Sequence, residues 1–266
     1  MKAFRMAGRL ESESPAVARL FELGSLGAVE EVSEGGPEIV AYFERRVVLG
    51  LEGRWEDVEA FDYVAAYRAE LEPVVVGPLV IAPTHRRAEL EAGQQVVWLD
   101  PGSAFGTGHH ETTRMALGAL AGLDLLGRSV LDVGAGSGIL SVCADRLGAG
   151  SAIGVDIDAA TVDVARRNAA LNRSRARFLA GSLDHPDLPA RFDVIVANLY
   201  VELHAALVPG YLGRLNAGGV LLLTGILTRL EPTVLRALPD DLPYRVERDG
   251  EWSLIAAGPA SSMAKR

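Results

Sequence analysis

Residues 130–140 constrain the fold of this chain more than any other segment. They begin with β-favouring residues, continue through the glycines Gly134, Gly136 and Gly138, and end in helix-forming residues. A strand, a tight turn and a helix in that order open a parallel α/β unit. Glycine adopts backbone angles that other residues avoid, and it lets a ligand approach the main chain. We therefore predict a parallel sheet with a ligand site at this turn.

The residues around the turn indicate the kind of ligand. Asp156 ends a second predicted strand about 20 residues further on, where a carboxylate can accept hydrogen bonds from two ribose hydroxyls. Asp132 precedes the turn, where a carboxylate would repel a pyrophosphate but suit a positively charged ligand. Ile139 replaces the third glycine of the dinucleotide fingerprint. This combination favours S-adenosylmethionine over NAD, although Asp156 could also share an ordinary helix cap with Asp158.

Two further strand ends would complete the site. The predicted strand 192–197 ends at Asn198 and Leu199, on the edge of the sheet where ligands gather. The Asn198 carbonyl can hold an amine with its lone pair directed at a sulfonium methyl, although a simple turn asparagine is the alternative. Ser182 and Leu183 follow another predicted strand and are placed to contact an adenine. The chain lacks the Asn-Pro-Pro-aromatic signature of enzymes that methylate planar nitrogens, which favours an aliphatic amine.

A glycine-rich loop around Phe105 precedes a helix that starts at Thr112 and Thr113. We expect the loop to fold over a ligand and the helix start to bind a carboxylate through its free N–H groups and hydroxyls. His109 and His110 lie in the same segment, but adjacent histidines do not readily share one ion and no third histidine has ligand spacing. We therefore predict no metal site.

Composition narrows the class of protein. The net charge of −9 disfavours a broad nucleic-acid surface, and no apolar run reaches the length of about 20 residues that a membrane helix needs. A single cysteine, Cys143, fits a reducing cytoplasm. Residues 1–72 hold eight lysines and arginines against fifteen aspartates and glutamates. Most of these charges are typical of a solvated acidic surface, and the alternative is that the segment attracts a basic partner.

The chain order predicts two domains. The segment 3–43 has the pattern strand, helix, strand, strand, which suggests a small α+β layer of the ferredoxin type, and a helix is expected over 55–71. From residue 96 onward strands and helices alternate, and a closing hairpin over 244–257 implies an antiparallel strand in a doubly wound, Rossmann-like α/β sheet. The predicted divisions are a recognition domain (1–60), a linker helix and hinge (61–77) and a catalytic domain (78–266).

Several motifs together resemble the bacterial ribosomal protein L11 methyltransferases, over residues 95–257. The most specific is the loop Gly-Thr-Gly-His-His-Glu-Thr-Thr at 106–113, and it is joined by Asp-Val-Gly-Ala-Gly-Ser-Gly at 132–138 and Ala-Asn-Leu at 197–199. The resemblance implies a class I methyltransferase domain behind a ferredoxin-like domain that recognises the substrate. It places cofactor contacts on Thr113, Gly134, Asp156 and Asn198.

The same resemblance implies trimethylation of lysine ε-amines and of the N-terminal α-amine of protein L11. The expected enzyme is a cytoplasmic monomer that takes L11 free, before ribosome assembly, without contacting nucleic acid or membrane. The match thins before residue 75, where family members tend to have tryptophans and a basic residue; this chain has Tyr63, Tyr67 and Glu72. A methyltransferase for another protein or a small-molecule amine is the main alternative. A nicotinamide oxidoreductase would need a glycine where this chain has Ile139. A purely binding module would not need Asn198 at the end of its strand.

Overall fold

A computed structural model shows the fold of the chain as two compact units, Met1–Ala66 and Tyr67–Arg266. Each unit is described by itself. The described residues are 2–10, 15–25, 27–33, 35–58, 71–100, 106 and 108–263. Within them, no helix is both long enough and apolar enough to span a membrane.

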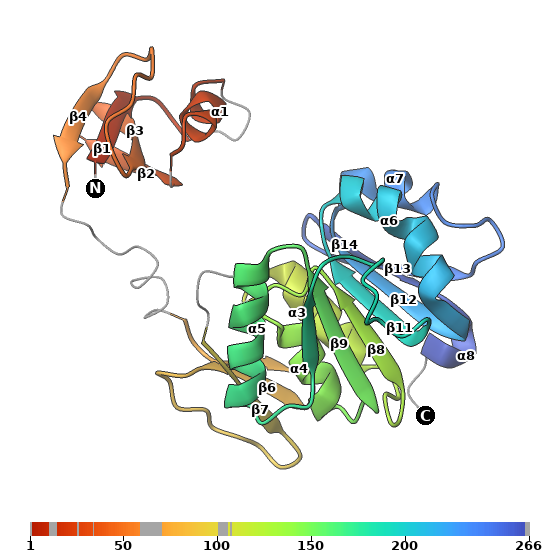
Figure 1. The fold of residues 1–266 in the computed structure, drawn as a ribbon. Coiled ribbons are helices and arrows are strands. Elements are labelled where there is room, and N and C mark those ends of the chain that lie inside the picture. Colours follow the sequence, from red (N-terminus) through yellow and green to blue (C-terminus); the bar gives the residue numbers. More distant parts are fainter. Residues whose placement is uncertain are drawn as a thin grey trace. The chain divides into compact units, whose positions relative to one another are not determined.

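In its described residues, the N-terminal unit is a four-stranded antiparallel sheet with one helix (Figure 1). Its elements are β1 (Lys2–Ala7), α1 (Pro15–Glu22), β2 (Gly27–Ser33), β3 (Gly36–Phe43) and β4 (Arg54–Asp57). The order β2-β3-β1-β4 is that of the predicted ferredoxin type. The connection 44–53, all of it described, contains no helix, so this version of the fold lacks the usual helix between its last two strands.

Strand β4 corrects one prediction, because a helix was expected to begin at residue 55. Trp55 points into the core, with its ring 5.2 Å from those of Phe4 and Phe43. Its neighbours Arg54 and Glu56 carry the charges of the opposite face. This alternation has the two-residue period of a strand and outweighs the helical spacing of the residues that follow. The remainder of the predicted helix, 59–70, lies outside the described residues, as does most of the predicted linker helix.

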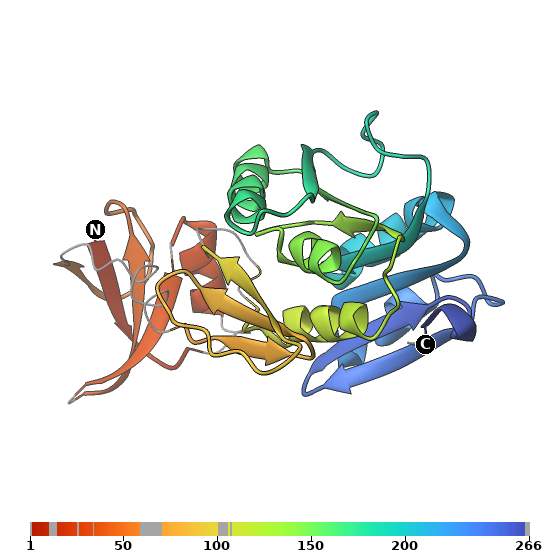
Figure 2. The ribbon, with the colours of Figure 1, turned by 90° about the horizontal axis from the view of Figure 1, so that it is seen from below.

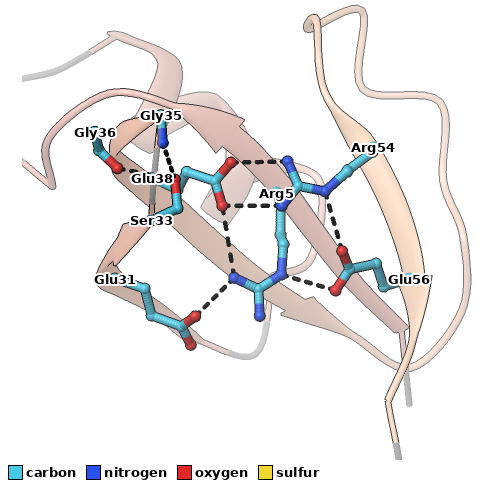
Figure 3. Close-up of polar contacts among 8 residues, drawn as sticks. All are labelled: Arg5, Glu31, Ser33, Gly35, Gly36, Glu38, Arg54 and Glu56. Atoms are coloured by element: carbon cyan, nitrogen blue, oxygen red, sulfur yellow. Dashed lines mark hydrogen bonds and ion pairs between the residues drawn. The ribbon is translucent and has the colours of Figure 1, made fainter.

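One face of the N-terminal sheet packs on α1, around a core of seven buried apolar residues that includes Phe4 and Leu20. The other face carries five charged side chains in one network (Figure 3). They are Arg5, Glu31, Glu38, Arg54 and Glu56.

The second unit begins with a small sheet, β5 (Val74–Val76), β6 (Leu79–Pro83) and β7 (Gln95–Leu99). Strand β7 agrees with the strand expected from residue 96 onward, whereas no strands were predicted at β5 and β6. Gly77, at φ +56°, allows the tight turn that pairs them antiparallel. The small sheet, coloured gold in Figure 2, packs against the same core as α3 (Glu111–Ala121), on one face of the larger sheet described next.

The catalytic sheet has seven strands in the order β10-β9-β8-β11-β12-β14-β13. The strands are β8 (Ser129–Val133), β9 (Ser151–Asp156), β10 (Arg177–Ala180), β11 (Phe192–Asn198), β12 (Leu215–Leu227), β13 (Tyr244–Asp249) and β14 (Trp252–Ala257). The first five in the sheet are parallel, and β14 pairs antiparallel with β12. The predicted doubly wound sheet with an antiparallel closing hairpin is confirmed.

Helices cover both faces of this sheet (Figure 1). They are α3 (Glu111–Ala121), α4 (Ile139–Arg146), α5 (Ala159–Leu171), α6 (Val201–Arg214), α7 (Glu231–Leu235) and α8 (Ala260–Met263), with a 3₁₀ turn η1 (Thr228–Leu230). Val130 and Val194 face the core under α3, α4 and α5, while Leu131 and Ile195 face the core under α6 and α7. The strands are therefore buried on both faces, as parallel strands require.

Candidate active site

A cavity of about 600 Å³ opens at the carboxyl ends of β8, β9 and β11. The strand order reverses between β8 and β11, so the cavity occupies the position where doubly wound sheets bind their ligands. Of the residues predicted from the sequence, the following line it: Thr112, Thr113, Gly134, Gly136, Asp156, Ser182, Asn198 and Leu199.

The glycine turn forms the floor of the cavity, and its backbone requires glycine. Gly134, Gly136 and Gly138 have φ of +74°, +54° and +79°, in the left-handed region. A Cβ on Gly138 would lie 2.7 Å from Cζ of Phe178. A Cβ on Gly134 would lie 2.4 Å from Cδ2 of Leu199. These glycines therefore let Phe178 of β10 and the side chain of Leu199 pack closely against the turn.

Asp156 holds the turn in place. Its carboxylate accepts hydrogen bonds from the Gly136 amide and the Asp158 amide, both at 3.0 Å. The cap of α5 is Asp158, which accepts from the Ala160 amide, so the helix-cap role falls on Asp158. The side chain of Asp156 lines the cavity and has acceptor capacity left for the hydroxyls of a ribose.

Two predicted residues lie elsewhere, and a third falls outside the described residues. Asp132 is fully buried beneath the turn and does not line the cavity; its Oδ2 accepts from the amide and hydroxyl of Ser141, because α4 starts directly above it. Burial raises the pKa of Asp132 to about 7. Leu183 packs in the core, where Gly210 of α6 leaves room for it. Phe105 lies outside the described residues.

The amide of Asn198 has an orientation set by the start of α3. Its Nδ2 donates to the hydroxyls of Thr112 at 3.2 Å and Thr113 at 3.4 Å. Nδ1 of His110 accepts from the Thr112 amide as the cap of α3, so the Thr112 hydroxyl can donate to the same nitrogen at 2.8 Å and still accept from Asn198. The amide nitrogen therefore faces α3, and the amide oxygen faces the opposite side.

Gly225 is the neighbour on that opposite side, and it has φ of +82°. A Cβ at Gly225 would lie 2.4 Å from the Leu199 carbonyl oxygen and 2.8 Å from Oδ1 of Asn198. The two oxygens therefore border the same small space at the cavity wall. This pair of acceptors is suited to a donor with two N–H groups, such as a primary amine.

Sequence reasoning missed several residues of the cavity. Gly225 was not predicted as a site residue, and Trp252 was assigned only to the closing hairpin. Trp252 packs edge-on against His110, with ring centroids 5.0 Å apart, and both line the cavity. Tyr200 and Leu203 add an apolar rim and are 74% and 47% exposed. No spacing signal links His110 to Trp252, because only the closing hairpin brings β14 beside α3.

The two adjacent histidines serve separate partners. Nε2 of His109 lies 2.7 Å from the Glu72 carbonyl oxygen, while His110 caps α3. Within the described ranges, no group of three histidine, cysteine, aspartate or glutamate side chains could hold a metal ion.

The reversed strand order, the glycine turn and the acidic end of β9 define a class I S-adenosylmethionine-dependent methyltransferase. Residues 22–258 match the model of the ribosomal protein L11 methyltransferase family (PrmA), and the chain belongs to this family. The ribosomal protein L11 methyltransferase of Thermus thermophilus is 44% identical over 97% of this chain and its own full length. That of Deinococcus radiodurans is 41% identical over 97% of this chain and 98% of its own.

Solved structures agree with the family. A ribosomal protein L11 methylase from Lactobacillus delbrueckii subsp. bulgaricus superposes with a TM-score of 0.65 and 32% identity, over 71% of this chain and 98% of its own. The 16S rRNA N2 G1207 methyltransferase of T. thermophilus, solved with S-adenosylmethionine and guanosine, has a TM-score of 0.51 and 26% identity, over 58% of this chain and 45% of its own. The methyl donor of this class is S-adenosylmethionine.

Proposed function

We propose that the chain trimethylates lysine ε-amines and the N-terminal α-amine of ribosomal protein L11. The observation that carries the choice of an amine acceptor is the pair of oxygens at Asn198 and Leu199, which border one space beside Gly225. A primary amine offers two N–H groups to these acceptors and leaves its lone pair free for attack. Asn198 and Leu199 are the proposed catalytic residues.

The donor supplies an electrophilic methyl group on a sulfonium. Asp156 would accept hydrogen bonds from its ribose, and the Gly134 and Gly136 backbone would border its methionine portion. Thr112 and Thr113, at the start of α3, would face its carboxylate through the Thr113 hydroxyl, because the amides of both residues already donate to His110. Ser182, which lines the cavity beyond β10, would contact its adenine. Gly138 gives the turn the shape that these contacts need.

The chain must also favour a neutral amine. A free lysine has a pKa of about 10.4, so at neutral pH it is protonated and cannot attack. The apolar rim of Tyr200 and Leu203 would desolvate the substrate side chain, and a positive charge in the cavity would add to this effect. Asn198 and Leu199 would then orient the amine, so that most of the rate enhancement comes from positioning.

Protein L11 is proposed to be taken free, in the cytoplasm, by a monomeric enzyme that does not contact nucleic acid. The excess of acidic residues in segment 1–72 supports attraction of a basic protein partner. Such attraction is screened by salt, so the apparent affinity for L11 should fall as ionic strength rises.

The first test is intact-mass analysis of purified L11 after incubation with the enzyme and S-adenosylmethionine. Mass gains that end at three methyl groups per modified amine, located by peptide mapping, are expected. Tight cofactor binding in calorimetry without any mass gain would instead favour another protein or a small-molecule amine as acceptor. Asn198→Ala should lose methyl transfer by about 100-fold while still folding, since the amine would lose one of its two acceptors.

A further inference from the structure

His204 lies directly behind the acceptor corner, defined by the pair of oxygens at Asn198 and Leu199. It has no part in the proposed contacts with donor or substrate. It is in the first turns of α6, and its side chain is completely buried. A buried histidine in a helix facing a sheet is an ordinary core residue unless its ring nitrogens hydrogen-bond to groups that shape the site. The partners of the ring decide between these alternatives.

The ring reaches the strand that ends at Gly225. Nε2 of His204 lies 2.8 Å from the Thr224 carbonyl oxygen, and a carbonyl only accepts, so Nε2 carries the proton. The same oxygen accepts from the Leu199 amide at 3.1 Å. The Thr224 carbonyl oxygen, next to Gly225, therefore links Leu199 to His204 on α6.

The protonation state of the ring is fixed. Burial lowers the pKa of His204 to about 4, against the opposing effect of the hydrogen bond to the Thr224 backbone. The ring is therefore neutral at physiological pH, with Nε2 as its single donor. Nδ1 is buried without a hydrogen-bond partner among the described residues. A histidine in this state cannot act as an acid, and its donor is already used by Thr224.

We propose that His204 is a positioning residue for methyl transfer: its Nε2–H clamps the Thr224 carbonyl and so fixes the Leu199 carbonyl and Gly225 in register. This inference rests on the proposed function of the Asn198–Leu199 corner. The clamp acts on the acceptor oxygens rather than on the donor, because Thr224 lies on β12 and the glycine turn lies at the end of β8.

Two substitutions distinguish a hydrogen-bonding role of His204 from a role in packing alone. His204→Gln keeps a side-chain N–H that can reach about as far as Nε2, whereas His204→Leu keeps an apolar bulk without a donor. Tyr211→Phe is the matched control. Tyr211 lies on the same helix with its ring 6.3 Å from His204, and its buried hydroxyl has no partner among the described residues, so this change removes no hydrogen bond.

The experiment measures kcat, KM for L11 and the dissociation constant of S-adenosylmethionine for the full-length variants, with folding checked by circular dichroism. We expect His204→Leu to lower kcat about 30-fold with the donor's dissociation constant within about two-fold of wild type, because misplacement of an attacking group costs about this much. His204→Gln should recover kcat to within about five-fold, and Tyr211→Phe should match wild type. The pH profile of His204→Gln should overlay that of the wild-type enzyme.

Two results would overturn the proposal. Wild-type kcat in His204→Leu would show that the clamp is not needed. Loss of activity in His204→Gln together with a changed acidic limb of the pH profile would assign His204 to proton transfer instead. Asn198→Ala, measured alongside, separates this inference from the proposed function. If Asn198→Ala retains full activity, the acceptor corner itself is wrong, whereas an inactive Asn198→Ala with an active His204→Leu rejects only the clamp.

Discussion

Carboxyl groups on the two main sheets of this protein have pKa values shifted in opposite directions. On the N-terminal sheet, Glu38 and Glu56 face arginines (Figure 3). Hydrogen bonds from Arg54 lower the pKa of Glu38, and hydrogen bonds from Arg5 and Arg54 lower that of Glu56. In the catalytic sheet, Asp132 has no cationic partner among the residues that the structure describes, and burial raises its pKa to about 7. Surroundings, rather than residue type, decide which protonation state favours folding.

The charged groups of the N-terminal sheet and the polar groups around the cavity also differ in how many partners each group has. Arg5 pairs with Glu31 at 2.7 Å and Glu56 at 2.8 Å, and Arg54 pairs with Glu38 at 2.7 Å and Glu56 at 3.0 Å. Loss of one partner leaves the others. Around the cavity, the Asn198 amide depends on the hydroxyls of Thr112 and Thr113, and a Cβ at Gly225 would lie 2.4 and 2.8 Å from two oxygens. We therefore expect small effects from single charge changes on the N-terminal sheet and large effects from single-atom changes at the catalytic corner.

The largest expected effect is on the apolar core of the N-terminal unit. Leu20 is fully buried under the sheet, and Leu20→Ala should destabilise this unit by about 2–5 kcal/mol, the usual cost of a cavity. Val32→Ala is the control, because Val32 is 86% exposed on β2. Chemical denaturation measures both. Equal effects of the two changes would mean that the core is not what holds this sheet.

The second prediction concerns the sign of the pH dependence. The folded pKa of Asp132 is raised, so its contribution to stability is present at low pH and is lost as pH rises toward 7. Asp132→Asn removes this loss. The difference in free energy of unfolding between variant and wild type should shift toward the variant by up to about 3 kcal/mol between pH 5 and pH 8. Urea denaturation at both pH values measures it, and a constant difference would contradict the assignment.

The third prediction tests the crowded corner. Gly225→Ala would place a methyl group against the Leu199 carbonyl and the Asn198 amide, and kcat should fall about 100-fold. Gly218→Ala is a matched control on the same strand. Gly218 also has a left-handed φ, of +77°, but a Cβ there meets nothing within 4 Å. Similar activity in both variants would show that the space beside Gly225 is not where the acceptor binds.

The smallest effect is expected for Arg54→Gln. Glu56 keeps Arg5 as a partner, and exposed ion pairs contribute little, so the melting temperature should change far less than in Leu20→Ala. The lowered pKa of Glu38 and Glu56 means that their contribution is present above about pH 4.5 and is lost as pH falls below it. Thermal melts at pH 7 and pH 3.5 should show a smaller deficit of the variant at pH 3.5 than at pH 7. A large deficit at pH 3.5 would contradict this account.

The sequence by itself determined the catalytic architecture. The strand-turn-helix at Gly134, the acidic end of β9 and the alternation of later elements are local signals, because each depends on residues near in sequence. The sequence did not reveal β4, since two-residue and helical periodicities compete over so short a segment. It also placed Asp132 toward the ligand, where the start of α4 draws the carboxylate inward instead.

Only the tertiary structure decided how the acceptor corner is built. The Asn198 amide is oriented by Thr112, 86 residues earlier in the chain, and its oxygen meets Gly225 from the next strand. His204 and Trp252 join the region only through α6 and the closing hairpin. A hydrogen bond depends on distances of a few tenths of an ångström between elements that the fold brings together. Residue spacing records which groups are present, whereas packing decides which oxygen faces the substrate.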